Sequence, residues 1–358
     1  MGKIRVLVVD DSSFARDLLR SLLEESGDIE IVAEAANGKE AVLLAIELKP
    51  DLITMDLEMP VMGGMDAITE IMATQAVPIL VVSGVTDASK ACAAVARGAL
   101  DVINKPDLDI AAGSEFVAKV KMLAKIRVIT HMRSRASEKA ALDIVHPMPA
   151  AMPPVISPAN IAIPPPGADA PRTFAIASST GGPQALALIL GMLPAVFPGA
   201  ILISQHIADG FASGMAQWLA SICKLPVRLA QEGEVVKAGT VYVSPSEANM
   251  AVTPSRRITL APRVLGEIYH PTCDVLLASV AAVYGRQGVG IILTGMGHDG
   301  AVGMEKIRHA GGATLAQDEA SSVIFGMNKV AIDRGGVQQV LPAGEIPQAM
   351  CRLAGLMV

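Results

Sequence analysis

Short aliphatic runs alternate with amphipathic segments along most of this chain, and this alternation restricts its fold more than any other feature. In the first third the aliphatic runs are IRVLVV, IEIVAEA, DLITM, VPILVV and ALDVIN. Helical spacing begins after them at Phe14, Lys39, Gly64, Ala88 and Gly113. Strands that alternate with helices favour a parallel sheet covered on both faces and connected by right-handed crossovers. We therefore expect an α/β domain of the (βα)5 type over residues 1–127.

The alternation returns in the second half of the chain. Strand-like runs occupy residues 173–177, 200–204, 240–243, 257–261, 288–293 and 313–316. Helical segments follow from Gln184, Ser213, Thr272 and Ala301. A chain of 358 residues is long enough for two domains that each bury a core. We predict a second α/β domain over residues 172–358, with a doubly wound and mostly parallel sheet.

A proline-rich stretch separates the two blocks. Its prolines are Pro147, Pro149, Pro153, Pro154, Pro158, Pro164, Pro165 and Pro166. Regular ladders exclude proline because it lacks the backbone N–H donor. We expect residues 128–171 to be an extended, semi-rigid tether between the domains. A peptide-recognition motif for a partner is the alternative, although PPP among alanines is common in spacers.

Composition argues against several classes of function. Aromatic residues make up 3% of the chain and the net charge is -6, so we expect no nucleic-acid partner. The cysteines are Cys92, Cys223, Cys273 and Cys351, and they form no CxxC pair. This usage favours reduced thiols packed in the cores of a cytoplasmic protein over a disulfide or zinc framework.

No targeting or membrane-spanning segment is expected. Residues 1–10 lack the cationic start, apolar stretch and cleavage site of a signal peptide. The uncharged run over residues 185–203 is long enough to span a bilayer. The residues that divide it are Gly191, Pro194, Pro198 and Gly199. We therefore expect a helix followed by a strand, and no membrane insertion.

Five polar residues fall at the carboxyl ends of strands in the first domain. They are Asp10 and Asp11 after the first run, Asp56 after the third, Ser83 at the fourth and Lys105 after the fifth. Such ends share one crevice in a parallel sheet. Crowded carboxylates repel, and a hard cation such as Mg²⁺ relieves the repulsion, while a lysine and a serine hold phosphoryl oxygens. Caps and turns are the alternative, but the shared position at strand ends favours a binding site.

The motifs around these residues resemble a response-regulator receiver domain over roughly residues 3–127. They are the DD pair, DLEMPVMGG, Ser83-Gly84 and Lys105-Pro106. The resemblance implies that a sensor histidine kinase transfers a phosphoryl group to Asp56, and that Ser83 and Lys105 bind this group. Receivers usually carry Tyr or Phe three residues before the lysine, whereas this chain has Val102.

The receiver resemblance also implies the Mg²⁺ that phosphorylation requires. Its ligands would be Asp11, Asp56 and the backbone carbonyl of Glu58, and Asp10 would contact the metal indirectly. No cofactor is expected in the second domain.

The second domain opens with FAIASSTGGP, followed by the helical run QALALILGML. The pattern predicts a strand, a tight turn and a helix. Such a turn lifts one side chain above the sheet edge and directs free helix N–H groups at the same place, so a nucleophile and an anion-stabilising site arise together. We predict that Ser179 is this nucleophile. The alternative is a cap in which Ser178, Ser179 and Thr180 satisfy helix N–H groups.

A serine hydroxyl needs an adjacent base and an orienting carboxylate before it can attack an ester. Polar residues again follow the strands, and we predict His206 as the base and Asp299 as the carboxylate. N–H groups of the turn, with Met296, would hold the oxyanion at roughly 3 kcal/mol per donor. The alternatives are a satisfied strand-end histidine and a helix-capping aspartate. Spacing alone leaves His270 and His298 as rival bases.

Gly295, Gly297 and Gly300 form a GxGxxG pattern between a strand-like run and a helix, with Asp318 near the place of a ribose-binding acid. A dinucleotide site is therefore an alternative. Asp299 opposes it, since a carboxylate at a helix N-terminus repels pyrophosphate. The pattern also comes late in the domain and not in its first strand-to-helix turn.

Five segments, in this order and after a receiver, resemble the chemotaxis protein-glutamate methylesterases of CheB type. They are FAIASSTGGPQAL, ISQHIADGF, VYVSP, ILTGMGHDGA and QDEASSVIFGM. The resemblance implies that Ser179, His206 and Asp299 are catalytic. It also implies that the Thr180 hydroxyl helps to position the histidine and that the Met296 backbone belongs to the oxyanion hole.

The same resemblance implies the substrate, a methylated glutamate on the helical cytoplasmic region of a methyl-accepting chemoreceptor. Hydrolysis would release methanol, and the same cycle on a receptor glutamine would release ammonia. Phosphorylation of Asp56 should raise the activity, and we expect the unphosphorylated receiver to cover the Ser179 crevice. A non-catalytic, phosphorylation-dependent adaptor is the alternative function. Asn249 in place of histidine and Asn328 in place of proline are expected to alter the rim of the site and leave the triad intact.

Overall fold

Five parallel strands form the sheet of the N-terminal domain in the computed structural model, which describes residues 2–84, 88–106, 110–126, 128, 171–263 and 269–356. They are β1 (Ile4–Val9), β2 (Ile29–Ala35), β3 (Leu52–Met55), β4 (Ile79–Ser83) and β5 (Asp101–Asn104), in the order β2-β1-β3-β4-β5. The helices are α1 (Ser13–Glu25), α2 (Gly38–Leu48), α3 (Gly64–Thr74), α4 (Ala88–Ala96) and α5 (Ile110–Leu123). α1 and α5 pack on one face and α2, α3 and α4 on the other, which confirms the predicted (βα)5 fold.

Seven parallel strands form the sheet of the C-terminal domain. They are β6 (Thr173–Ser178), β7 (Ala200–Gln205), β8 (Val227–Leu229), β9 (Val241–Val243), β12 (Gly288–Ile292), β13 (Ala313–Gln317) and β14 (Gln339–Leu341), in the order β14-β13-β12-β6-β7-β9-β8. Helices α6 (Gly182–Met192), α7 (Phe211–Ile222) and α11 (Ile346–Leu353) pack on one face. Helices α8 (Cys273–Tyr284), α9 (Ala301–His309) and α10 (Met327–Asp333) pack on the other. The predicted doubly wound fold is confirmed.

The aliphatic pattern did not predict the shorter elements of the C-terminal domain, namely β8, β10 (Ala248–Val252), β14, α10 and α11. β8 and β14 have three residues each and include half-buried side chains, so their pattern is too short to detect. β11 (Ile258–Pro262) was predicted as a strand, but it pairs with β10 in a separate antiparallel hairpin and not with the main sheet.

The strand order reverses beside the first strand of each sheet. β1 lies between β2 and β3, and β6 lies between β12 and β7. A parallel α/β sheet opens a crevice at such a reversal, at the carboxyl ends of the strands. Asp10 and Asp56 follow β1 and β3, while Ser179 follows β6. Both predicted sites therefore lie where the topology creates a crevice.

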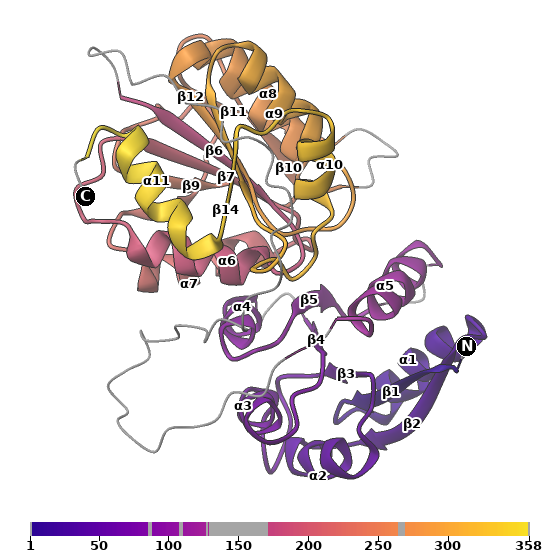
Figure 1. Ribbon diagram of the computed structural model, residues 1–358. Helices are drawn as coiled ribbons and strands as arrows, with labels where there is room; N and C mark the ends of the chain where they lie inside the picture. The colour runs from indigo at the N-terminus through magenta and orange to yellow at the C-terminus, as the bar shows by residue number, and fades with distance from the viewer. Residues whose placement is uncertain are drawn as a thin grey trace.

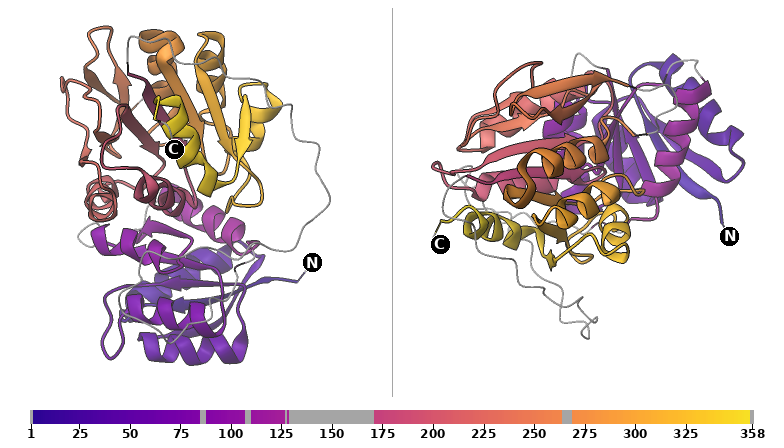
Figure 2. Two further views of the ribbon diagram at one scale, coloured as in Figure 1. Left: turned by 60° about the vertical axis from the view of Figure 1, so that its left-hand side comes forward. Right: turned by 90° about the horizontal axis from the view of Figure 1, so that it is seen from above.

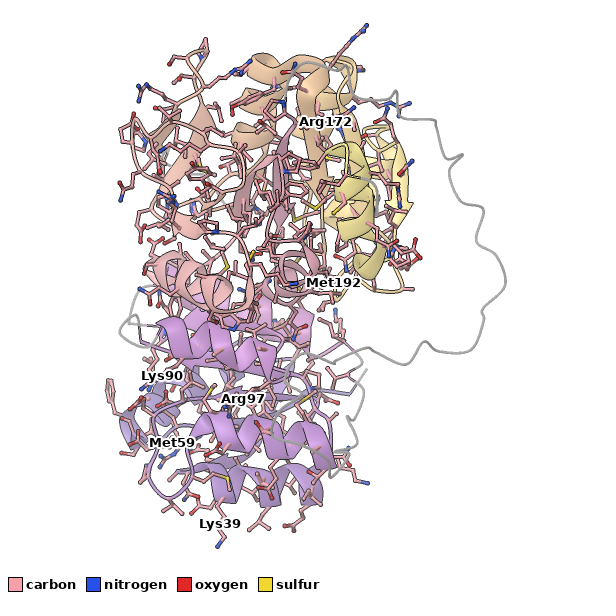
Figure 3. All side chains as sticks on the ribbon, turned by 90° about the vertical axis from the view of Figure 1, so that its left-hand side faces the viewer. Lys39, Met59, Lys90, Arg97, Arg172 and Met192 are labelled. Atoms are coloured by element: carbon pink, nitrogen blue, oxygen red, sulfur yellow. The ribbon has the colours of Figure 1, made fainter. Side chains whose placement is uncertain are left out.

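The two domains pack directly against each other (Figure 1, Figure 2). α4 lies along α6 and α7, and Cys92 of α4 is part of an apolar cluster that belongs mainly to the C-terminal domain. Arg172, just before β6, lies at the end of that domain remote from the N-terminal one (Figure 3). The carboxyl ends of β6 and its parallel neighbours consequently face the junction. Within the described ranges, no helix has the length and apolarity to cross a membrane.

Candidate active site

Ser179 lies in the tight turn between β6 and α6. Gly181 has a φ of 78°, a left-handed conformation that suits glycine, and a Cβ there would lie 2.5 Å from Val323. The Ser179 N–H donates to the Thr294 carbonyl at 3.0 Å, which ties the turn to the end of β12. Ser179 is 9% exposed, and its hydroxyl has no hydrogen-bond partner among the described residues. Among the described residues, the turn therefore places in the crevice a hydroxyl that is not hydrogen-bonded.

The register of β6 and β7 places Ser179 beside His206. Ser178 pairs with Gln205 at the strand ends, and the His206 N–H donates to the Ser178 carbonyl at 2.9 Å. The Gln205 amide donates to the Ser179 carbonyl at 2.8 Å, and its oxygen accepts the Ser178 hydroxyl at 2.6 Å. A Cβ on Gly182 would lie 2.0 Å from that oxygen, so glycine makes room for the amide.

Asp299 supplies the carboxylate for His206. Its Oδ2 lies 2.7 Å from Nε2 of the imidazole, and the residue is 3% exposed. Burial raises the pKa of Asp299, but hydrogen bonds from His206 and from the N–H groups of Cys273 and Asp274 outweigh burial and hold this pKa below its usual value. An ionised carboxylate at Nε2 keeps the ring proton on that nitrogen. Nδ1 is then the nitrogen left to act as a base.

Tyr269 fixes the plane of the His206 imidazole. The two rings are stacked, with centroids 5.1 Å apart and 16° between their planes. His298 meets the same tyrosine edge-on at 5.5 Å. The carbonyl of His270 accepts the Ile207 N–H at 3.0 Å. Of the three candidate bases, His206 is the one whose ring is bonded to the Asp299 carboxylate.

Two backbone N–H groups at the crevice have no acceptor within the described parts of the chain. They belong to Thr180, in the turn after Ser179, and to Met296, in the loop after β12. The Ser179 N–H is already bonded to a carbonyl. Free N–H groups beside a nucleophile stabilise the negative oxygen that forms when a carbonyl is attacked. The crevice thus contains a candidate nucleophile and a candidate oxyanion hole, the two parts that acyl transfer needs.

The Thr180 side chain contacts the N-terminal domain. Its hydroxyl donates at 2.8 Å to Oδ2 of Asp101 on β5, and Lys119 of α5 pairs with the same oxygen at 3.2 Å. Gln184 of α6 also donates to the carbonyl of Val95, in α4, and to that of Ala99, just after α4. The resemblance implied that the Thr180 hydroxyl helps to position the histidine. With the domains packed as they are here, this hydroxyl is engaged by Asp101 instead.

The end of β5 reaches the loop that begins with His206. The Asn104 amide donates to the Asp209 carbonyl at 3.2 Å. Asp209 is also ion-paired with Arg263. Because Asn104 precedes Lys105, the two predicted sites are joined by one short strand.

Carboxylates of the chain bond N–H groups at the start of α9, where a GxGxxG site would place the pyrophosphate of a dinucleotide. The Gly300 N–H donates to Oδ1 of Asp299 at 3.0 Å, and the Gly303 N–H donates to Oδ1 of Asp274 at 2.6 Å. Carboxylates of the chain therefore occupy the first turn of α9. Asp318 accepts from the Ser321 N–H at 3.0 Å, as a local turn residue does.

Asp10, Asp11 and Asp56 form an acidic cluster typical of a Mg²⁺ site, with one ligand atom from each within 4.8 Å of the others. Lys105 Nζ lies 2.8 Å from Asp10 and 2.9 Å from Asp56. Burial raises the pKa of Asp56, Lys105 opposes this, and the Asp10 charge adds to it. A divalent cation would relieve that repulsion, so the residues fit the ion. The buried Ser83 hydroxyl has no partner in the described residues, which suits a phosphoryl oxygen.

Glu58 and Val102 lie near this cluster. The Glu58 side chain is ion-paired with Lys90, and both are more than half exposed. Val102 is 6% exposed and packs in the core of the N-terminal domain. A buried valine has no ring that could rotate outward on phosphorylation.

Asn249 and Asn328, which were expected to alter the rim of the site, are themselves buried. They are 3% and 0% exposed. Asn249 accepts the Thr272 N–H at 2.7 Å, and the Asn328 amide donates at 3.0 Å to the Gln317 carbonyl. Each side chain amide is hydrogen-bonded to a backbone group of another segment, so both residues stabilise the backbone beneath the surface.

Sequence reasoning missed three residues of the site: Tyr269, Cys273 and Asp101. Cys273 was expected to pack in a core, and it does, but its Sγ also lies 3.4 Å from Nε2 of His206. Its position directly before Asp274 at the start of α8 gives no local signal. These contacts join segments far apart in the sequence, so pattern and spacing do not show them.

Comparisons with known proteins agree with this geometry. Residues 174–350 match the sequence profile described as CheB methylesterase, and residues 6–112 match the response regulator receiver domain. A protein-glutamate methylesterase/protein-glutamine glutaminase of Paramagnetospirillum magneticum is 55% identical over 358 residues, which cover all of this chain and 98% of that protein. One from Pyrococcus abyssi is 37% identical over 98% of this chain and 93% of its own. The crystal structure of the Thermotoga maritima CheB methylesterase catalytic domain matches with a TM-score of 0.50 and 35% identity, over 52% of this chain and all of that one.

Proposed function

Because this chain belongs to the CheB methylesterase family and is a protein-glutamate methylesterase/protein-glutamine glutaminase regulated by a receiver domain, we propose that Ser179, His206 and Asp299 perform its hydrolysis. The observation that supports this most directly is the 2.7 Å contact between His206 and Asp299, in the crevice where Ser179 leaves its strand. The proposed limits are residues 1–127 for the receiver, 128–171 for the tether and 172–358 for the esterase.

The reaction passes through an acyl-enzyme. Nδ1 of His206 takes the hydroxyl proton while Oγ of Ser179 attacks the γ-ester carbonyl of a methylated glutamate. The N–H groups of Thr180 and Met296 hold the oxyanion. The imidazolium, stabilised by Asp299, then gives the proton to the methoxy oxygen, and methanol leaves. Water activated by His206 cleaves the acyl-serine and restores the hydroxyl. With a glutamine side chain the leaving group is ammonia.

The family implies chemoreceptor substrates, and the receiver implies a kinase as phosphodonor. More specifically, we propose methylated glutamates on the helical cytoplasmic region of a methyl-accepting receptor, and a sensor histidine kinase. The proposed location is the cytoplasm, without membrane insertion or a nucleic-acid partner.

The decisive test is methanol release from a methylated receptor fragment, measured with and without a small-molecule phosphodonor. We expect release that rises when the phosphodonor and Mg²⁺ are both present. Retention of NAD(H) by the purified protein, with no methanol formed, would favour the dinucleotide alternative.

Asp56 is the proposed phosphoryl acceptor, and Lys105 and Ser83 would bind the phosphoryl oxygens. The residues that would hold Mg²⁺ are Asp11, Asp56 and the carbonyl of Glu58, with Asp10 in indirect contact. The ion supplies neutralisation of the charge that develops during phosphoryl transfer.

Asp56→Asn is expected to abolish the response to phosphodonor, because an amide does not accept the phosphoryl group. Methanol release should then be equal with and without the donor. Asp66→Asn, at an exposed carboxylate in α3, is the matched control and should keep the response. A full response from the Asp56 variant would assign the acceptor elsewhere.

We propose that the unphosphorylated receiver restrains the esterase by covering the crevice. α4 and β5 lie over it, and Asp101 keeps the Thr180 hydroxyl away from His206. A fragment of residues 171–358 should therefore hydrolyse the substrate faster than the unphosphorylated full chain, by roughly 5–150-fold if the coupling is of ordinary size. Circular dichroism would establish that the fragment is folded. A folded fragment no faster than the full chain would rule out restraint by covering.

A further inference from the structure

We propose that Cys273, His206 and Asp299 form a binding site for a thiophilic divalent cation, with Zn²⁺ as the probe, and that the bound cation inhibits the esterase. One ligand atom from each residue lies within 4.8 Å of the other two. The binding stands on this geometry alone. The inhibition rests on the proposed roles of His206 and Asp299.

One of the ligand distances already matches a tetrahedral zinc site, and a second must open. Bonds of about 2.3 Å to sulfur and about 2.0 Å to nitrogen and oxygen place S and N about 3.5 Å apart and N and O about 3.3 Å apart. Sγ of Cys273 already lies 3.4 Å from Nε2 of His206. The 2.7 Å between Nε2 and Oδ2 of Asp299 must open by about 0.6 Å. The imidazole, stacked on Tyr269, would have to shift in its own plane to provide this opening.

The ligand types select a different cation from the receiver site. Thiolate, imidazole and carboxylate together suit Zn²⁺, whereas the carboxylates of Asp10, Asp11 and Asp56 suit Mg²⁺. Cys273 is fully buried, and burial raises the pKa of its thiol well above the usual value. The thiol therefore stays protonated without a metal and does not compete with Ser179 as a nucleophile. A coordinated cation displaces that proton.

The proton balance explains why the cation would inhibit. In the free enzyme the ring nitrogen next to Asp299, Nε2, is the one that donates a proton to the carboxylate. A cation bound at Nε2 moves this proton to Nδ1, and the thiol proton of Cys273 is released to solvent. Nδ1 can then no longer accept the proton of Ser179, so the nucleophile is not activated.

Binding is tested with Co²⁺ in the full-length Ser179→Ala protein, which needs no catalysis. We expect the thiolate-to-cobalt charge-transfer absorption, and we expect Cys273→Ser in the same background to lose it. Cobalt held by the acidic cluster gives no such band, since its ligands are oxygens. Cys351→Ser removes another buried thiol, on α11, and should leave the band unchanged. An absent band, or one that survives Cys273→Ser, would overturn the site.

Inhibition is tested by methanol release from the full chain at fixed Mg²⁺ and buffered free Zn²⁺, with each variant compared with its own zinc-free rate. Zn²⁺ should inhibit reversibly, and a chelator should restore the rate. Cys273→Val and Cys273→Ser should each raise the inhibitory Zn²⁺ concentration at least tenfold. Loss of a residue that only hydrogen-bonds to a metal ligand already costs about 10–100-fold in metal affinity, and Cys273 would be a ligand itself. Equal sensitivity of the wild type and both variants would refute inhibition through Cys273. An active Ser179→Ala protein would refute the proposed function and leave the cobalt result standing.

Discussion

Ser179→Ala is expected to lower kcat for methanol release by about 10⁵–10⁶-fold, the size of effect seen when a triad nucleophile is removed. The hydroxyl is the proposed nucleophile for the acyl intermediate, and it has no partner among the described residues that would give it a structural role. KM should change little, because a methyl-sized side chain at this position still admits the substrate. The measurement is steady-state methanol release with a methylated receptor fragment.

The adjacent Ser178 provides the control for Ser179→Ala. Its hydroxyl is buried and donates to Gln205 at 2.6 Å, so Ser178→Ala should cost about 1 kcal/mol of stability and keep the nucleophile. A fluorophosphonate should label the wild type and Ser178→Ala, but not Ser179→Ala. Unlabelled wild-type protein would favour the adaptor alternative, and a Ser179→Ala rate above a tenth of wild type would remove this serine from the mechanism.

Asp299→Asn is expected to lower kcat by about 10⁴-fold while the fold persists. The Asp299 carboxylate accepts from His206 and from the N–H groups of Cys273, Asp274 and Gly300. An asparagine amide turns one of these acceptors into a donor, which shifts the histidine proton to Nδ1 and removes the base proposed for Ser179. Activity and thermal unfolding should be measured together.

The pKa of Asp299 also predicts how its variant depends on pH. This pKa is lowered in the folded protein, so the ionised carboxylate stabilises the fold at neutral pH, and the contribution disappears as the pH falls through the lowered pKa. Asp299→Asn should therefore be less stable than wild type near neutrality and should approach it in acid. Asp274→Asn, at a neighbouring half-buried carboxylate outside the triad, is the control and should retain most of the activity. Equal kcat losses in the two variants would contradict a special role for Asp299.

The strands that position the sites could be predicted because they are long aliphatic runs. β1, β3, β6 and β12 are buried nearly throughout, so hydrophobic pattern alone reveals them. The rule that polar strand ends converge then brings Ser179 and His206 to one crevice without any coordinates. β8 and β14 could not be found in this way, since their three residues are too few for a pattern.

The contacts that define the chemistry could not be predicted, because they depend on how distant segments pack. The stacking of Tyr269 on His206 and the contact of Cys273 with the same ring arise where the start of α8 meets β7. The bond from Thr180 to Asp101 joins residues 79 positions apart in different domains. Neither composition nor spacing specifies such pairs, and a family resemblance assigned Thr180 a different partner.

Strand β5 connects the esterase crevice with the acidic cluster of the receiver. Asp101 at its start accepts a hydrogen bond from Thr180, and Asn104 at its end donates one to Asp209. Lys105, the next residue, is ion-paired with Asp56. If phosphorylation of Asp56 loosens the crevice, as proposed above, the coupling is reciprocal, and a substrate bound in the crevice shifts the phosphorylation equilibrium of Asp56 toward the phosphorylated form. At equilibrium, a molecule bound to a methylated receptor would therefore retain its phosphoryl group more strongly than an unbound molecule, and the phosphorylated form would accumulate at the substrate.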